Sequence, residues 1–336
     1  MPSPTAIPAL LLTGPFTRET ALGLGITPRV LNGQRFVRLF STVWTLRDRP
    51  TSESDWIFAA RLAVPSRAHL TGLTRIRSLG LGVGTLRPFH FVITGDLHLD
   101  LLDIFLHRTI RLPPTDDGGV TPAAAFIAYA LEARLIDAIK VGDWLLHHKH
   151  MTLIGLRELC RHDRWRPGSR EAMWVSRYLE GDSRSLKESE TRAILIFAGL
   201  PTPDSNKEIT SGPQVLGIGD LTYLRWELVV EYEGSQHQED RDQWNSDIDR
   251  YADFREAGLN YVQVTKEKLG RPRKLASEVY RQLIAGRYAG PPPVFAGRWR
   301  SLFGPIADAM PRGGGLGTTR TSPVVFNPPG LADDGV

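Results

Sequence analysis

The residues best suited to chemistry are three acidic side chains in the second half of the chain. Glu231 and Glu233 lie two positions apart on a β-branched and aromatic run, and ten residues separate Asp220 from Glu231. Residues two apart on a strand share a face, so a hairpin with the strand of Asp220 would bring the three carboxylates together. Like charges this close need compensation, and carboxylate oxygens suit hard cations. The spacing therefore predicts a Mg²⁺ or Mn²⁺ site.

The segments around these acids predict the order helix, strand, strand, helix, strand. Ser185 and Glu188 fit a capping box ahead of an apolar segment that stops at Gly199. A second helical pattern contains residues 247–251, and residues 260–265 then alternate as a strand does. These elements would position the acidic residues on the strands of one sheet.

This combination resembles the PD-(D/E)XK nuclease superfamily, and more narrowly the small domains related to very short patch repair endonucleases. The pattern is an acid on the first helix, an Asp on one strand, Glu-x-Glu-Gly-x-x-His on the next, and Asp-x-x-Arg on a helix. The resemblance covers about residues 181–285. It implies a restriction-endonuclease-like α/β core with a mixed sheet and metal-dependent hydrolysis of DNA.

The resemblance also implies a role for each acidic position. Asp220 and Glu231 would bind the metal, Glu188 would orient a water molecule, and His237 would lie close to the scissile phosphate. Glu233 stands where the superfamily has a Lys, although the related small domains often carry an acid there. Glu233 would therefore either join a second metal ion or block catalysis.

Composition argues for a protein of the reducing cytoplasm without a membrane span. The 336 residues include 41% hydrophobic residues and one cysteine, Cys160, which we expect to be a buried hydrophobe. No apolar run approaches the roughly 20 residues that span a bilayer, and the start lacks the features of a signal peptide. A net charge of +4 supports nucleic-acid binding only where the charges cluster.

Residues 14–46 predict a helix, a turn, a second helix with Pro28 at its first position, and two short strands. This reduced winged helix resembles the start of AbiEi-type antitoxins, in which a similar Phe-Thr-Arg, here residues 16–18, opens the first helix. The resemblance continues through residue 165. It implies DNA binding and a toxin or operon partner; packing of the module with solvated arginines is the alternative.

Residues 161–185 interleave arginines with Trp165 and Trp174, which suits either a nucleic-acid surface or a solvated helix face. For DNA contact the sequence and the two resemblances together give these candidates: Arg29, Arg35, Arg38, Arg164, Arg166, Arg170 and Arg250.

The middle of the chain predicts strands at residues 89–93 and 109–112, separated by a loop with His98 and His107. Three helices should follow, beginning near residues 122, 135 and 153. The run His147 to His150 is expected to be a polar helix end rather than a metal site, because successive helical residues point in different directions.

These patterns divide the α/β chain into five parts. They are a winged helix (1–50), an α+β region (51–165), an Arg-rich connector (166–184), a nuclease-like domain (185–288) and a Gly/Pro-rich tail (289–336) with little to bury, in which a short helix at residues 298–303 could dock. We expect a metal-dependent DNA endonuclease. The alternatives are an AbiEi-like antitoxin or regulator with an inactive nuclease fold, and an interaction scaffold. Cleavage in the presence of Mg²⁺ distinguishes the first two.

Overall fold

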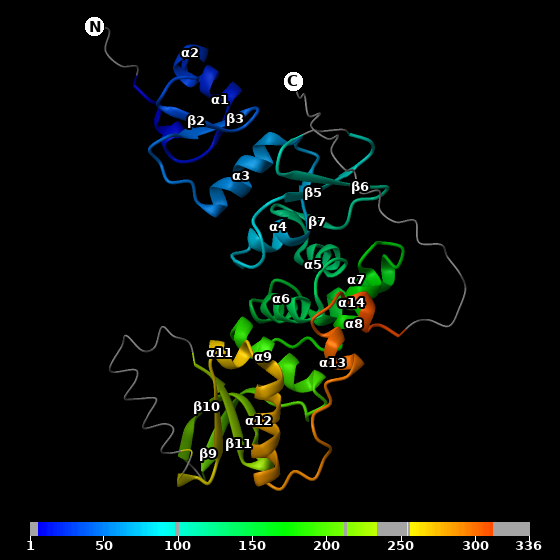
Figure 1. Cartoon of the computed structure of the whole chain (residues 1–336). Coiled ribbons are helices and arrows are strands. Elements are labelled where there is room, and N and C mark those ends of the chain that lie inside the picture. The colour runs from blue at the N-terminus through cyan, green and yellow to red at the C-terminus, as the bar shows by residue number, and fades with distance from the viewer. Residues whose placement is uncertain (1–5, 98–100, 212–213, 234–253, 255, 312–336) are drawn as a thin grey trace, which may run out of the picture.

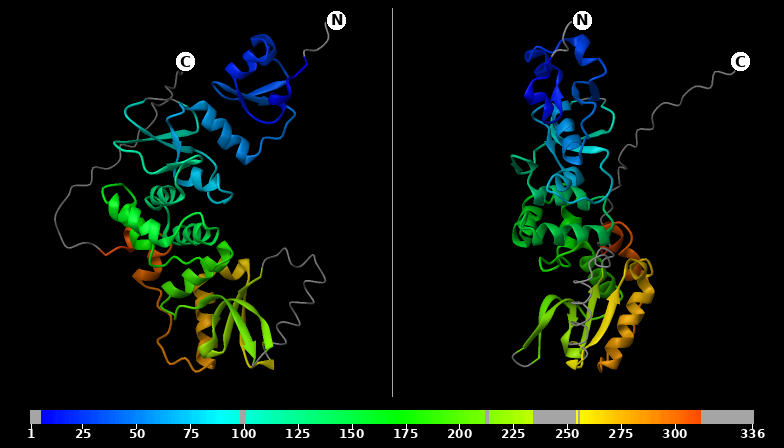
Figure 2. Two further views of the ribbon diagram at one scale, coloured as in Figure 1. Left: turned by 180° about the vertical axis from the view of Figure 1, so that it is seen from behind. Right: turned by 90° about the vertical axis from the view of Figure 1, so that its left-hand side faces the viewer.

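The molecule is elongated, with a small module at one end, a four-stranded sheet at the other and helices between them (Figures 1 and 2). The computed structural model describes residues 6–97, 101–211, 214–233, 254 and 256–311. The mixture of helices with antiparallel and mixed sheets agrees with the expected α/β class. Within the described ranges, no helix has both the length and the apolar character needed to cross a membrane.

The first module has the elements that the sequence predicts. Thr17 and Thr27 cap its two helices with their side chains, and Pro28 is the first residue of the second. Its strands form a sheet in the order β1-β3-β2 around a small core that includes Phe16, Leu31 and Trp44. The elements are η1 (Ala9–Leu12), β1 (Phe16–Thr17), α1 (Arg18–Gly23), α2 (Pro28–Leu31), β2 (Phe36–Phe40) and β3 (Val43–Leu46).

The next unit corrects one strand prediction. The strand expected at residues 109–112 instead covers Ile104–Thr109 and pairs in parallel with β5, so His107 lies on a strand and not in a loop. Leu112 precedes two prolines, which restrict the residue before them and donate no hydrogen bond. The elements are α3 (Glu53–Ala63), β4 (His69–Leu70), α4 (Gly72–Arg77), β5 (Phe89–Thr94), β6 (Ile104–Thr109), β7 (Thr115–Asp116) and β8 (Gly119–Val120).

Four helices follow, and the first three begin where the sequence predicts. They are α5 (Pro122–Ala130), α6 (Leu135–His147), α7 (Leu153–His162) and α8 (Ser169–Val175). Cys160 is buried in α7, where burial raises the pKa of its thiol to about 11, as expected for an inert hydrophobe. The supposed connector is also structured, because Trp174 and Val175 of α8 are buried in the main hydrophobic core.

The C-terminal sheet has the order β12-β11-β10-β9, with β11 and β12 parallel and the other neighbours antiparallel. Leu221, Val230 and Val262 face α9 and α12, whereas Val229 packs with Phe254 on the other face. The elements are α9 (Leu186–Phe197), β9 (Asp204–Ser211), β10 (Gln214–Tyr223), η2 (Leu224–Trp226), β11 (Leu228–Tyr232), β12 (Asn260–Val264), α11 (Lys266–Leu269) and α12 (Pro272–Ala285).

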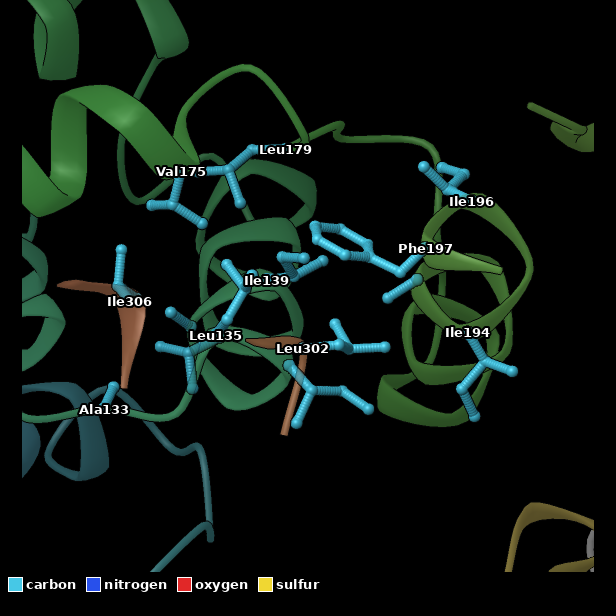
Figure 3. Close-up of a cluster of buried hydrophobic side chains, with 14 of the residues drawn as sticks. Ala133, Leu135, Ile139, Val175, Leu179, Ile194, Ile196, Phe197, Leu302 and Ile306 are labelled. Atoms are coloured by element: carbon cyan, nitrogen blue, oxygen red, sulfur yellow. The ribbon is translucent and has the colours of Figure 1, made fainter. Parts of the chain in front are cut away.

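Residues 290–311 differ from the expected tail with little to bury. This segment, which we call the strap, contains α13 (Gly297–Ser301) and α14 (Ile306–Ala309). Trp299, Leu302 and Ile306 are almost fully buried, and the first residues of α6 donate backbone hydrogen bonds to the carbonyls of Leu302 and Gly304. Figure 3 shows Leu302 among side chains of α6 and α9. α13 agrees with the short helix that the sequence predicts at residues 298–303, whereas α14 and the burial of Ile306 were not predicted.

A buried ion pair joins α6 to α9 inside this core. Arg192 contacts Asp143 at 2.7 Å and Glu180 at 2.9 Å, and the side chains of the first two are 3% and 0% exposed. Asp143 also accepts a hydrogen bond from the Glu180 backbone N–H. Because the same core runs from Ile76 to Ile306, residue 185 does not mark the edge of a separate core.

Removing a strap side chain should destabilise the whole core. Leu302→Ala should lower the free energy of unfolding by about 2–5 kcal/mol, because it leaves a cavity between α6 and α9. Val294→Ala, in the same segment but 58% exposed, should change it by no more than about 0.5 kcal/mol. Denaturant unfolding measures both, and equal effects would contradict a docked strap.

The buried Asp143 should make stability depend on pH. Burial raises its pKa to about 6 against the opposing attraction of Arg192, so the folded state favours the protonated acid. Protonation of Asp143 adds up to about 3 kcal/mol to the free energy of unfolding. This contribution is complete below pH 3.8 and is lost as the pH rises through about 6. The difference in unfolding free energy between wild type and Asp143→Asn should follow this curve. A difference that is constant between pH 4 and 7 would exclude the assignment.

Candidate active site on the C-terminal sheet

Asp220 and Glu231 lie side by side on neighbouring antiparallel strands. Leu221 of β10 pairs with Val230 of β11, and one further step of this register sets Asp220 opposite Glu231. The Tyr232 backbone N–H donates to Asp220 Oδ2 at 2.9 Å, which holds the carboxylate against the end of β11. The hairpin that the sequence predicted therefore exists, and it brings two of the acids together.

The two acids belong to a row of oxygen-bearing side chains across the sheet. Glu231 pairs in register with Gln263 of β12, and the pairs on either side of Asp220 set Asn206 of β9 opposite it. Glu231 is buried, 4% exposed, and the Tyr261 hydroxyl donates to its Oε2 at 3.5 Å. Asp220 is only half buried. One carboxylate is thus enclosed and its neighbour is accessible from solvent.

Glu188 reaches this row through Asn206. Ser185 Oγ accepts the Glu188 backbone N–H at the start of α9, as the expected cap requires. Glu188 Oε2 in turn accepts hydrogen bonds from the Arg184 backbone N–H at 2.8 Å and from Asn206 Nδ2 at 2.7 Å. The structure therefore ties the helix acid to β9 through the Asn206 carboxamide, at the residue that the register sets opposite Asp220.

Of the other predicted catalytic residues, the structure describes Glu233. Glu233 follows β11 and donates its backbone N–H to the Val264 carbonyl at 2.9 Å. In the part of the chain that the structure describes, no group of three His, Cys, Asp or Glu side chains is placed to hold a metal ion, so a three-carboxylate cluster is not seen. His237 lies outside the described residues, as does Arg250.

The donor chemistry of the row nevertheless fits a hard divalent cation. Mg²⁺ keeps several of its water molecules and is commonly bound through one or two carboxylates. Asp220 and Glu231 supply two adjacent carboxylates, and the register sets Asn206 and Gln263 opposite them on the neighbouring strands. These residues could hold Mg²⁺ or Mn²⁺ without a third acid.

The predicted DNA-contacting arginines are in different environments. Arg29, Arg38, Arg164 and Arg170 are exposed and Arg35 is half buried. Arg166 is committed to packing, because its guanidinium pairs with Asp163 at 2.7 Å and lies 4.6 Å from the Trp165 ring centre. Arg166 is therefore a weaker candidate for phosphate than its exposed neighbours.

Two sets of candidate functional residues were not predicted from the sequence. Asn206 and Gln263 join the row only through strand register, for which their local sequence gives no signal. The second set is the basic run Lys266 to Lys274, five cations in nine residues, which a count of charge along the chain would have found.

The end of α6 agrees with the polar helix end that the sequence predicts. The rings of His148 and His150 stack near Trp144, with His148 centred 4.4 Å from the Trp144 ring. His147 Nδ1 lies 3.0 Å from the carbonyl oxygen of Gly181. No metal-binding group appears here either, within the residues described.

Divalent ions should stabilise the protein if the row binds them. Mn²⁺ at a hundredfold excess over its dissociation constant should add about 2.7 kcal/mol to the folded state by mass action. Glu231→Gln should reduce the resulting rise in melting temperature, whereas Glu208→Gln, an exposed acid of β9, should not. Differential scanning fluorimetry measures this, and no Mn²⁺ response in the wild type would exclude the site.

Comparison with known proteins gives two curated relatives. Both are uncharacterized proteins of Mycobacterium tuberculosis, one from strain CDC 1551 / Oshkosh and one from strain ATCC 25618 / H37Rv. Each is 25% identical over 170 residues, which is 50% of this chain and 63% of the relative. No family model matches the chain. No solved structure matches it either.

Proposed function

We propose that the protein is a metal-dependent endonuclease that hydrolyses phosphodiester bonds in DNA. The observation that carries the proposal is the pairing of Asp220 with Glu231 on adjacent strands, fixed by the Tyr232 N–H. The described elements α9, β10, β11 and β12 follow the expected order, with β9 as an additional strand, and residues 247–251, where a second helix is expected, lie outside the described residues.

In this proposal Asp220 and Glu231 hold the ion. When bound, the ion would supply Lewis-acid stabilisation of the negative charge that develops on the phosphate. Asp220 is accessible and its orientation is set by the backbone of β11. Glu231 is enclosed beside Tyr261, so its charge acts in a poorly solvated environment, where electrostatic interactions are stronger.

Glu188 has a positioning role in the proposed site. Its contact with Asn206 ties the start of α9 to the sheet edge beside Asp220, and it presents a carboxylate close to the row. Residue 233 matters for the charge of the site, because Glu233 stands where the nuclease superfamily has a Lys and the positive charge of that Lys is missing here. A second cation, or a cation from elsewhere in the protein, would then take over that positive charge.

The test is cleavage of supercoiled plasmid by the full chain with Mg²⁺ or Mn²⁺. Asp220→Asn and Glu231→Gln should each lower the rate at least about a hundredfold, because each removes a carboxylate that stabilises the reaction's charges. Glu208→Gln should cleave like the wild type. Glu233→Lys should keep or increase cleavage, because it restores a positive charge beside the pair.

Two outcomes would overturn the proposal. One is cleavage that persists unchanged in both Asp220→Asn and Glu231→Gln, which would point to a contaminating nuclease. The other is a folded wild type that binds DNA and never cleaves it with either ion. That second result would favour the antitoxin-like regulator with an inactive nuclease fold.

A further inference from the structure

The basic run at residues 266–274 gives the C-terminal domain a charged surface that the proposed site does not use. Five of its nine residues are Lys or Arg and one is Glu267. Arg271, Arg273 and Lys274 are exposed at the start of α12. So many positive charges on a short, ordered segment are typical of a surface that binds a polyanion.

The run leaves the sheet at the end that carries the acid pair. Gln263, the register partner of Glu231, is the penultimate residue of β12, and α11 begins at Lys266. Val264 is also the residue whose carbonyl accepts the Glu233 N–H. α11 and the start of α12 therefore follow the end of β12 at which Gln263 pairs with Glu231, and Figure 1 shows α11 at this end of the sheet.

Intramolecular acids neutralise little of this charge. Among the described residues of the run, Lys268 forms an ion pair, with Glu278 at 2.8 Å, and Arg273 lies 5.8 Å from the Phe295 ring centre. The first turn of α12 contains no acidic residue, although cations at a helix start are unfavourable to its dipole. The cations at the start of α12 are therefore unfavourable to the helix by themselves, and a bound external anion would compensate their charge.

A cavity of about 360 Å³ lies next to these cations. Arg271, Pro272, Arg273 and Lys274 form one side, and Trp299 and Phe303 of the strap form the other. Arg298 and Arg300 flank Trp299 on α13 and are exposed. Trp299 is almost fully buried, so the exposed cations around the opening, and not base stacking on this ring, would contact a nucleic-acid strand.

We propose that Arg271, Arg273 and Lys274 bind the phosphate backbone of the nucleic acid whose cleavage is proposed above. These three residues and the cavity form what we call the basic end surface. It lies in the sheet domain itself, so the nucleic acid would reach the acid pair without depending on the arginines of residues 1–50. This inference takes its substrate class from the proposed function, but it concerns binding and not hydrolysis.

The test measures binding of a short fluorescent DNA duplex by anisotropy, in EDTA, over a series of salt concentrations. The variant is the full chain with Arg271→Gln, Arg273→Gln and Lys274→Gln. If each cation contacts one phosphate, the slope of log affinity against log salt should become shallower by about 2.7, since each contact contributes about 0.9. Affinity at low salt should fall with it.

The matched control removes three exposed cations from the other end of the domain: Arg225→Gln, Arg281→Gln and Arg287→Gln. It loses the same charge, and its slope should stay near the wild-type value. Wild-type slope in the first variant, or an equal loss in both, would overturn the inference. Because binding is measured in EDTA, it does not depend on cleavage, so the two proposals can fail separately. If the first variant loses binding and the wild type never cleaves DNA with Mg²⁺ or Mn²⁺, the basic end surface stands and the endonuclease proposal fails. If the wild type cleaves DNA and the first variant binds it normally, the endonuclease proposal stands and the basic end surface is excluded.

Discussion

The buried contact between Asp143 and Arg192 is the constraint on which the arrangement of the C-terminal half depends. Two charges that are almost fully buried are costly unless every polar group around them is satisfied. Glu180 supplies a second carboxylate to Arg192 and a backbone N–H to Asp143, and the Tyr178 carbonyl accepts from the guanidinium. These contacts require one relative position of α6 and α9.

The relative position of α6 and α9 also affects the candidate site. The loop that contains Glu180 continues to Asp182, whose carbonyl accepts a hydrogen bond from Asn206 Nδ2. Asn206 also binds Glu188 and lies opposite Asp220 in the sheet register. The ion pair in the core and the acid pair on the sheet are therefore connected through backbone and side-chain hydrogen bonds, without a flexible linker between them.

Acidic and basic side chains are separated at the end of the sheet. Asp220 and Glu231 concentrate negative charge in the row, and Arg271, Arg273 and Lys274 concentrate positive charge just beyond β12. A polyanion is repelled by the first and attracted by the second, so the cations would offset the cost of bringing a phosphate near two carboxylates. Trp299 of the strap, which is buried, lines the cavity next to these cations.

The sequence by itself determined most helices, Pro28 at the start of the second helix, the short helix near residue 298, and the strand–strand pairing that joins Asp220 to Glu231, because those features depend on local periodicity and spacing. Tertiary structure alone decided how deeply Leu302 and Ile306 are buried, the β6 boundary and the place of Asn206 opposite Asp220. Each of these depends on contacts between residues distant in the chain. Leu302 illustrates the reason: its sequence predicts a short helix that could dock, but its full burial depends on the side chains of α6 and α9 around it.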